Sequence, residues 1–303
     1  MQERQDEISR KIRSFLHSSH CQTMTDIQAA ASTSHFIEAN GVRLHYLNYG
    51  KAGQRPMLCV HGGAAHAHWF DFVAPGLTPN HQVYSMDLRG HGDSARAAPQ
   101  TYAWKTFSDD VNALVEKLDL RDYVLVGHSM GGMVSLVHAA AYPGRIGALV
   151  VIDSVMLMPM ERVTRMRAFG ERPSKGYATQ EELVARYRLE GGGKHMAAPE
   201  VLRRMALYSS RQNGDGLWEH KADRGVYANF KQIAGVPLWE KVKVPTLVIR
   251  GGEHSPRFTP EVMSEIRARA PQVQMAEVPA SDHHITLDNP QGFVDVVQKF
   301  LRG

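Results

Sequence analysis

The sequence contains only two cysteines among its 303 residues, Cys21 and Cys59, and they lie far apart in the chain. Small domains that depend on disulfides for stability use many more cysteines than this. Cys59 lies within a short apolar run typical of a strand, which predicts a buried thiol. The low cysteine content excludes a disulfide scaffold and favours a reducing compartment.

Long apolar runs are also absent. No stretch approaches the roughly 20 apolar residues that a membrane-spanning helix requires. The N-terminus lacks the apolar segment of a secretory signal peptide. The sequence therefore predicts no interaction with membranes, and together with the cysteine usage it predicts a cytoplasmic protein.

Clusters of positive charge are missing as well, although the chain carries a net charge of +4. Residues 156–240 contain 14 Lys and Arg against 10 Asp and Glu, and this difference of four equals the whole excess. The basic residues form no long run and do not alternate with aromatic residues, as a nucleic-acid-binding surface requires. We therefore expect a small-molecule substrate as partner and no nucleic acid. The sequence leaves open whether the chain is a monomer or a homodimer.

Short apolar runs, in contrast, occur at intervals along the chain. Residues 36–46 alternate about Asn40-Gly41, which predicts a β-hairpin. Continuous apolar runs separated by helix-length segments are typical of a parallel sheet covered on both faces. Six such runs are present, at residues 57–60, 82–86, 123–126, 148–152, 245–249 and 273–278. The sequence therefore predicts an α/β fold with a mostly parallel eight-stranded sheet, in which the first two strands are antiparallel.

The regular pattern is interrupted in two places, which divides the chain into three parts. Residues 1–34 are polar or small and predict a flexible N-terminal extension. Residues 156–240 contain helix-compatible stretches joined by glycine-rich segments, without strand candidates, and predict a helical insertion. The α/β core is expected to comprise residues 35–155 and 241–303.

A serine lies at the end of one predicted strand, within the sequence GHSMGG at residues 127–132. A strand-like run precedes this sequence and a helix-like segment follows it. A sharp turn from strand to helix forces the residue at its tip into a strained backbone conformation, and Gly127 and Gly131 leave the space for it. The context predicts that Ser129 presents its hydroxyl above the edge of the sheet.

Other polar side chains follow the predicted strands at the sheet edge where ligands bind in open α/β sheets. Asp153 follows the sixth strand, and Asp282, His283 and His284 follow the eighth. A serine hydroxyl becomes a good nucleophile only when a base takes its proton, and the base needs a third group to hold its tautomer. The strand ends supply a serine, an acid and a histidine in that order.

These motifs resemble the α/β-hydrolase superfamily. The resemblance covers residues 35–303 and rests on GHSMGG, on HGG at residues 61–63, on DLRGHGDS at residues 87–94 and on a late histidine. It implies that Ser129 is the nucleophile and that the backbone N–H groups of Gly63 and Met130 stabilise the tetrahedral intermediate. It also implies that the inserted helices form a cap over the active site.

The resemblance identifies His283 as the base. In this superfamily the catalytic histidine precedes a proline that opens the last helix, and His283 lies seven positions before Pro290. His284 is the alternative, with a role in the wall of the pocket or at the surface if His283 is the base.

The acid has two candidates. Ser255 occupies the position after the seventh strand where many members of the superfamily carry an aspartate, and a serine cannot stabilise an imidazolium by its charge. Some members take the acid from the end of the sixth strand, where this sequence has Asp153. We favour Asp153 over Glu253, and the alternative role for Asp153 is to cap the first helix of the insertion.

Other polar residues receive a role outside catalysis. His66 and His68 lie two apart in a loop without carboxylate or cysteine partners at ligand spacing, so we expect no metal site and no cofactor. We expect the two rings to line the mouth of the pocket or to face solvent. Asp109 and Asp110 lie on the helix before the fifth strand, and we interpret them as part of a solvated face.

The residues and the resemblance together predict a serine hydrolase that cleaves a small, largely apolar carboxylic ester or lactone through an acyl-enzyme. A C–C bond hydrolase of the meta-cleavage type is the alternative reaction. Those relatives hold a substrate carboxylate with an arginine, which the sequence alone does not single out here. A non-catalytic ligand receptor on the same scaffold is the alternative from another class, because a fold does not determine a function.

Overall fold

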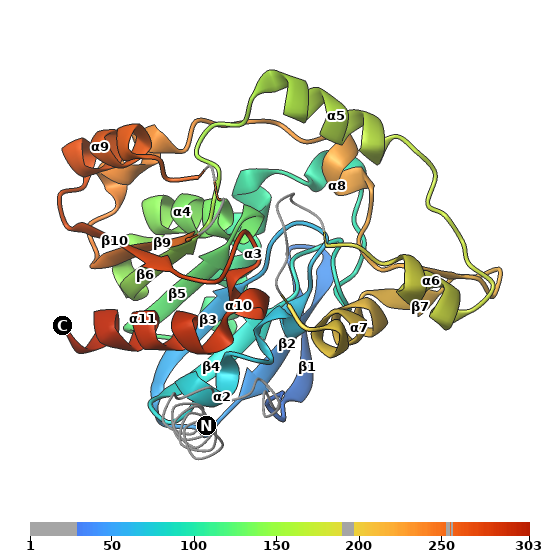
Figure 1. Cartoon of the computed structure of the whole chain (residues 1–303), viewed down its shortest axis with the longest axis horizontal. Coiled ribbons are helices and arrows are strands. Elements are labelled where there is room, and N and C mark those ends of the chain that lie inside the picture. The colour runs from blue at the N-terminus through green and yellow to red at the C-terminus, as the bar shows by residue number, and fades with distance from the viewer. Residues whose placement is uncertain (1–28, 190–196, 253–254, 256) are drawn as a thin grey trace, which may run out of the picture.

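A computed structural model of the chain describes residues 29–189, 197–252, 255 and 257–303. The strands of its main sheet are β1 Thr33–Ala39, β2 Val42–Tyr49, β3 Arg55–Val60, β4 His81–Met86, β5 Tyr123–His128, β6 Ile146–Ile152, β9 Thr246–Gly251 and β10 Val273–Val278. Their order across the sheet is β1-β2-β4-β3-β5-β6-β9-β10 (Figure 1). β2 is antiparallel to both of its neighbours, and every other pair is parallel. The predicted α/β fold with a mostly parallel eight-stranded sheet is confirmed.

The hairpin that opens the sheet turns at the predicted dipeptide. Asn40 and Gly41 both have positive φ angles, of 50° and 74°, which short-sided or side-chain-free residues adopt most readily. β1 begins at Thr33, so the sheet starts two residues before the expected boundary at residue 35. Residues 1–28 of the predicted N-terminal extension lie outside the described residues.

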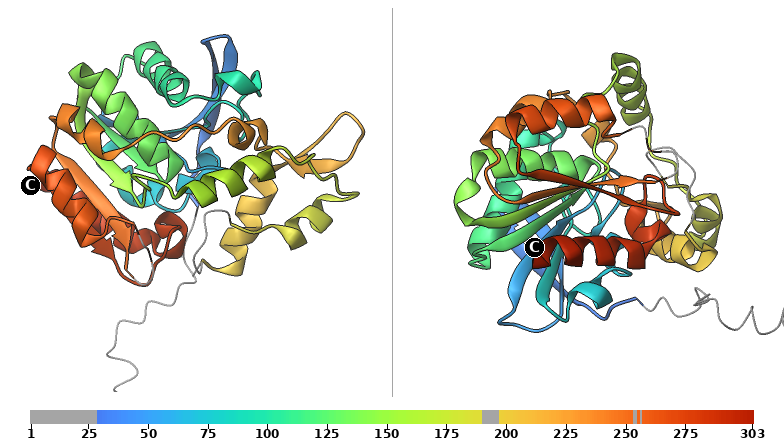
Figure 2. Two further views of the ribbon diagram at one scale, coloured as in Figure 1. Left: turned by 90° about the horizontal axis from the view of Figure 1, so that it is seen from above. Right: turned by 60° about the vertical axis from the view of Figure 1, so that its left-hand side comes forward.

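Helices cover both faces of the sheet (Figure 2). One face carries α3 Trp104–Lys117, α4 Met130–Ala141 and α9 Pro260–Arg269, and the other carries α2 Ala74–Leu77 and α11 Pro290–Arg302. Each face buries its own apolar cluster against the strands, which explains why the central strands are apolar throughout. None of the described helices is long and apolar enough to cross a membrane.

Asp110 on α3 is fully buried, so its assignment to a solvated face was wrong. Both of its carboxylate oxygens accept hydrogen bonds from Arg89, at 2.6 Å from Nε and 2.6 Å from Nη2. Arg89 lies in the loop after β4, and the two side chains are 3% and 0% exposed. A buried carboxylate is tolerated when a cation pairs with it. Here the cation is Arg89, which lies outside α3, so the sequence of the helix does not reveal it. Asp109 next to it stays partly exposed and pairs with Lys105.

The segment between β6 and β9 contains a hairpin as well as helices. Its elements are α5 Met160–Gly170, α6 Gln180–Arg186, α7 Pro199–Tyr208, β7 Ser210–Gln212, β8 Trp218–His220, α8 Gly225–Ala228 and the 3-10 helix η5 Val236–Lys241. β7 and β8 pair in an antiparallel two-stranded sheet, so the expectation that this segment has no strands was wrong. The side chain of Asn213 accepts hydrogen bonds from the N–H groups of Asp215 and Leu217, and this forms the turn. Strands of three residues are too short to show an alternating pattern.

This segment lies over the carboxyl ends of the strands. Figure 1 shows α5 next to α8 above that edge of the sheet, with α6 and α7 beside them. A partly buried ion pair ties α7 to the core, since Arg204 donates from Nε to Asp71 at 2.8 Å. Asp71 is fully buried and also accepts a hydrogen bond of 2.7 Å from the hydroxyl of Tyr49 on β2.

Candidate active site

Ser129 lies at the tip of the turn between β5 and α4, as the sequence predicts. Its φ of 54° and ψ of −114° are strained for a residue with a side chain. Hydrogen bonds hold the turn in place. The Ser129 N–H donates to the Ile152 carbonyl at 2.8 Å, and the Ser154 hydroxyl donates to the Ser129 carbonyl at 2.7 Å.

The glycines on either side of Ser129 are required by close backbone contacts. A Cβ atom at Gly131 would lie 2.3 Å from the carbonyl oxygen of Val60, and one at Gly127 would lie 2.4 Å from the carbonyl oxygen of Gly131. Real side chains essentially never approach this closely, so any larger residue would displace α4 from the strands. The turn therefore depends on both glycines, for reasons of space.

His283 and Asp153 are in direct contact. The Nδ1–H of His283 donates to Oδ2 of Asp153 at 2.7 Å, and the two side chains are 3% and 0% exposed. Asp153 follows directly after β6, and His283 lies in the loop after β10. With the Nδ1 proton directed at a carboxylate, the Nε2 lone pair of His283 is left to act as a base.

His128 connects this pair to the serine. It directly precedes Ser129, and its Nε2–H donates to the carbonyl oxygen of His283 at 2.8 Å. Ser129 and His283 line the same pocket. The structure thus brings Ser129, His283 and Asp153 to one edge of the sheet from three strand ends.

His284 occupies a different position from His283. Its ring packs edge-on against the indole of Trp69, with the ring centroids 5.7 Å apart. The ring of His283 lies 4.9 Å away, and both line the pocket. This contact fits the alternative that the sequence left for His284, a residue in the wall of the pocket.

The Asp153 carboxylate also accepts from two other side chains, and sequence reasoning missed one of them. The Ser255 hydroxyl donates to Oδ1 at 2.5 Å, and Nη1 of Arg257 donates to Oδ2 at 2.9 Å. The only sequence signal for Arg257 is its place in the loop after a buried strand, and this does not indicate what it contacts. Glu253, the alternative acid, lies outside the described residues.

Burial and positive charge set the protonation of this pair. Burial lowers the pKa of His283 well below its usual value, and the nearby guanidinium groups of Arg257 and Arg162 lower it further. His283 is therefore a neutral base at neutral pH. Burial raises the pKa of Asp153, while Arg257 and Ser255 oppose that rise.

Three histidines lie together in the pocket, but the charge around them opposes a bound cation. Ring nitrogens of His128, His283 and His284 lie within 4.8 Å of one another. The same two arginines that lower the pKa of His283 would repel a divalent ion at this place.

The loop histidines considered in the sequence make structural contacts. His66 lies within hydrogen-bond distance of the carbonyl oxygen of Met205, at 3.1 Å. His68 lies 3.1 Å from the carboxylate of Asp71. The first contact joins the loop after β3 to α7, and the second lies within that loop. His66 is buried and neither ring is among those that line the pocket, which differs from the expected place at the pocket mouth or in solvent.

Gly63 and Met130 both line the pocket. A Cβ atom at Gly63 would lie 3.1 Å from the hydroxyl of Tyr227 and 3.8 Å from the sulfur of Met130, so a side chain at this position would fill the space between them. Met130 is the first residue of α4, where backbone N–H groups have no partner within the helix. Both residues line the same pocket as Ser129, and their role as donors to an oxyanion stays a prediction.

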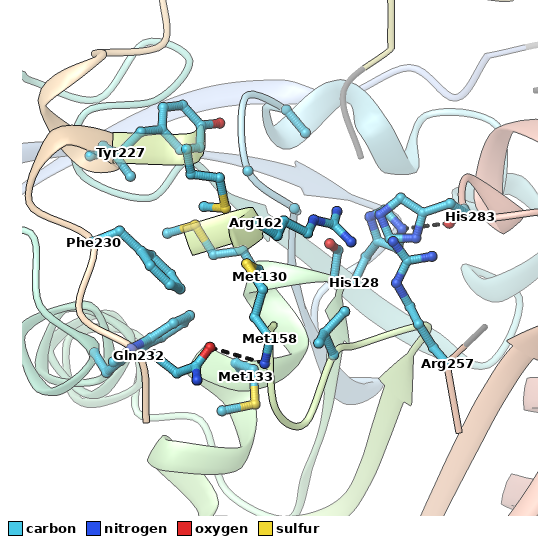
Figure 3. A pocket seen from close by; sticks show the side chains of 18 of the residues that line it. His128, Met130, Met133, Met158, Arg162, Tyr227, Phe230, Gln232, Arg257 and His283 are labelled. Carbon is cyan, nitrogen blue, oxygen red and sulfur yellow. Dashed lines mark hydrogen bonds between the residues drawn. The ribbon is translucent and has the colours of Figure 1, made fainter. Parts of the chain in front are cut away.

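The pocket has a volume of about 570 Å³ and combines an apolar part with a cationic end. Figure 3 shows Arg162, Arg257, His128 and His283 gathered on one side. Its other walls are apolar or aromatic, formed among others by Trp104, Met133, Met166, Phe169, Val226, Phe230 and Ile233. Most of these come from the segment between β6 and β9, so this segment determines the shape of the site.

Comparison with known proteins gives one family. The sequence pattern of the alpha/beta hydrolase fold family matches residues 55–290. The chain is 32% identical to the sn-1-specific diacylglycerol lipase ABHD11 of Mus musculus, over 73% of this chain and 71% of that protein. It is 26% identical to the 2-(acetamidomethylene)succinate hydrolase of Mesorhizobium japonicum, over 91% and 99%. The crystal structure of an E-2-(acetamidomethylene)succinate hydrolase is similar in fold, with a TM-score of 0.78 at 22% identity, over 90% of this chain and all of that one.

Proposed function

The chain belongs to the α/β-hydrolase fold family, and from this premise we propose that it is a serine hydrolase that cleaves a carboxylic ester or lactone. The observation that carries the proposal is the buried hydrogen bond between His283 and Asp153 in the pocket that Ser129 lines. A base held by a buried acid beside a strained serine is the arrangement that activates a hydroxyl for attack on a carbonyl carbon.

Each group has a role in two half-reactions. His283 takes the proton of the Ser129 hydroxyl as the oxygen attacks the carbonyl carbon, and Asp153 stabilises the imidazolium that forms. The backbone N–H groups of Gly63 and Met130 hold the resulting oxyanion. His283 then protonates the leaving alcohol, and an acyl group remains on Ser129. Water, deprotonated by His283, attacks the acyl-enzyme, and His283 returns this proton to the Ser129 oxygen as the acid is released.

Residues 156–240 act as the cap of this enzyme. Arg162 and Phe169 from α5 and Tyr227 and Phe230 from around α8 line the pocket opposite the strand ends. Closing the site from above restricts water and determines which substrates fit.

Labelling with a fluorophosphonate tests this proposal. The probe phosphonylates a serine only when a nearby base activates it, so we expect one adduct per chain, located on Ser129 by mass spectrometry of the peptides. Heat-denatured protein serves as the control and should not react. A folded protein that leaves Ser129 unlabelled would favour the non-catalytic ligand receptor instead.

The cationic end of the pocket favours a substrate that carries a carboxylate. Arg162, Arg165 and Arg257 all line the pocket. Burial lowers the pKa of Arg162, and the positive charges of Arg257 and Arg165 lower it further. An anionic group bound among them would relieve this repulsion. By its name, the relative from Mesorhizobium japonicum acts on a succinate derivative. The same feature favours the second candidate reaction, a C–C bond hydrolase of the meta-cleavage type.

A matched pair of esters tests the preference for a carboxylate. We expect 4-nitrophenyl hydrogen glutarate to be hydrolysed with a higher kcat/KM than the neutral 4-nitrophenyl valerate. Arg162→Gln should lower kcat/KM for the charged ester roughly tenfold or more, because a hydrogen bond to a charged group contributes about 1.5–3 kcal/mol. The value for the neutral ester should change little.

Arg145→Gln is the control for this comparison. Arg145 lies before β6, at the opposite end of the strands from the pocket, and pairs with Asp119 at the surface. The Arg145→Gln substitution removes one positive charge, as Arg162→Gln does, but at a place outside the pocket. Equal effects of the two substitutions on both esters would show that Arg162 does not select the charge of the substrate.

A further inference from the structure

Both oxygens of the Asp153 carboxylate are held by two residues that follow β9. Ser255 donates to Oδ1 at 2.5 Å, and Arg257 donates to Oδ2 at 2.9 Å. The two residues are also bonded to each other, since the Arg257 N–H donates to the Ser255 oxygen at 3.2 Å. Because a carboxylate oxygen only accepts, the Ser255 hydroxyl directs its proton at Asp153 while its oxygen accepts from the backbone. The two residues therefore form one clamp on the carboxylate, which we call the Ser255–Arg257 clamp.

The clamp lies on the same carboxylate that orients His283. Oδ2 of Asp153 accepts from Arg257 and from Nδ1 of His283 at once. The Arg257 side chain is only 5% exposed and the Asp153 side chain is fully buried, so water screens their interaction little. With Oδ1 occupied by Ser255, rotation of the carboxylate away from His283 would break three hydrogen bonds.

A buried carboxylate needs such support to remain charged. Removing it from water favours the neutral acid, and a neutral acid cannot stabilise the imidazolium that forms during catalysis. A guanidinium and a hydroxyl donor both favour the charged form. Ser255 stands at the position where many α/β-hydrolases carry the acid itself, and in this chain its hydroxyl contacts the acid supplied by β6.

We propose that Ser255 and Arg257 are positioning residues that keep Asp153 ionised and directed at His283, an inference that rests on the proposed serine hydrolase function. Neither side chain exchanges a proton with the substrate in this scheme. Their effect reaches the reaction through Asp153 and through the charge that Arg257 places beside His283.

The clamp determines the lowest pH at which the enzyme remains active. Removing the charge of Arg257 makes Asp153 easier to protonate and also makes His283 more basic, because a neighbouring positive charge disfavours the imidazolium. Both changes convert the site to its inactive protonated form at a higher pH. The other charged or titratable described groups beside the pair include His128 at the end of β5, His284 and the buried Asp282 on either side of His283 in the chain, and Arg162 on α5. Burial lowers the pKa of His128 to about 3, so it stays neutral throughout.

The test is the pH dependence of kcat/KM for an ester, which reports the groups that titrate in the free enzyme. We expect Arg257→Met to move the acidic limb of the profile upward by about one pH unit or more, the size of shift that one close charge produces. Ser255→Ala should move it in the same direction by less. Arg257→Lys retains the charge and should keep the limb near that of the wild type, with a lower kcat because the fork of donors is lost.

Arg250→Met is the matched control. Arg250 lies on β9, close to the clamp in sequence, and pairs with Glu277 on the neighbouring strand at a more exposed place. It should leave the acidic limb unchanged. A merely structural role for the clamp would lower kcat/KM at every pH and leave the limb in place.

The outcomes separate this inference from the proposed function. If Arg257→Met and Ser255→Ala both turn over the ester and the acidic limb of neither profile moves, the clamp proposal is wrong. The serine hydrolase proposal is unaffected by that result. If circular dichroism shows that Arg257→Met does not fold, Ser255→Ala and Arg257→Lys decide in its place, and an unmoved limb in Ser255→Ala overturns the proposal. Absence of Ser129-dependent turnover in the wild type at any pH overturns both.

Discussion

Replacement of Ser129 by alanine is expected to lower kcat for an ester substrate by roughly a millionfold, the effect of removing the nucleophile from a serine hydrolase. The hydroxyl of Ser154, which lies close to Ser129, is not placed to act instead. Ser154 is buried and its hydroxyl donates to the carbonyl of Ser129 itself. The measurement is the initial rate of 4-nitrophenol release at saturating ester, corrected for the rate without protein.

Ser135→Ala is the matched control for this experiment. Ser135 lies on α4 as well and is fully buried, and its hydroxyl has no hydrogen-bond partner among the described residues. The same chemical change at this place should alter kcat by only a few fold. A Ser129→Ala protein that keeps a tenth or more of the wild-type rate would contradict the assignment of Ser129 as nucleophile.

Asp153→Asn is expected to lower kcat roughly ten-thousandfold with little loss of fold, as the corresponding change does in enzymes with an established Ser-His-Asp triad. The amide has one oxygen, whereas Ser255, Arg257 and His283 are three donors that share the carboxylate in the wild type. The amide nitrogen is a donor, and facing His283 it would force the proton onto Nε2. That tautomer cannot accept the proton of Ser129.

The comparison with Glu253→Gln makes this prediction decisive between the two candidate acids. It removes the same charge by the same chemistry from the loop after β9, and we expect it to keep most of the wild-type kcat. Thermal unfolding followed by circular dichroism establishes that both variants are folded. Near-full activity in Asp153→Asn together with a large loss in Glu253→Gln would show that Glu253 is the acid.

The two acid candidates illustrate why part of the site could not be read from sequence. Asp153 and Glu253 both follow predicted strands, and both could have faced the base at the shared edge of the sheet. The contact between His283 and Asp153 joins residues 130 positions apart, and the clamp joins residues 102 and 104 positions apart. No spacing along the chain encodes such distances, because they depend on how the strands are ordered in the sheet.

Two wrong predictions, for Asp110 and for the β7–β8 hairpin, also concern features that sequence patterns do not encode. Asp110 has the sequence surroundings of a surface carboxylate, but Arg89 from another loop meets it and both become buried. The β7–β8 hairpin was missed because three-residue strands carry no periodic signal. The cationic end of the pocket combines arginines from α5 and from the loop after β9, which the sequence separates by about ninety residues.

By itself, the sequence determined the α/β sheet, the turn that carries Ser129 and the family of the chain. These features are encoded locally. The strand, turn and helix around Ser129 lie within about twenty consecutive residues, and apolar runs and two glycines that the close packing of α4 requires indicate them in the sequence. Only the tertiary structure decided which carboxylate contacts His283, what holds that carboxylate, and which charges line the pocket. Those contacts form where the ends of β5, β6, β9 and β10 meet, and the strength of a buried charge interaction depends on distance and exposure, which exist only once the chain is folded.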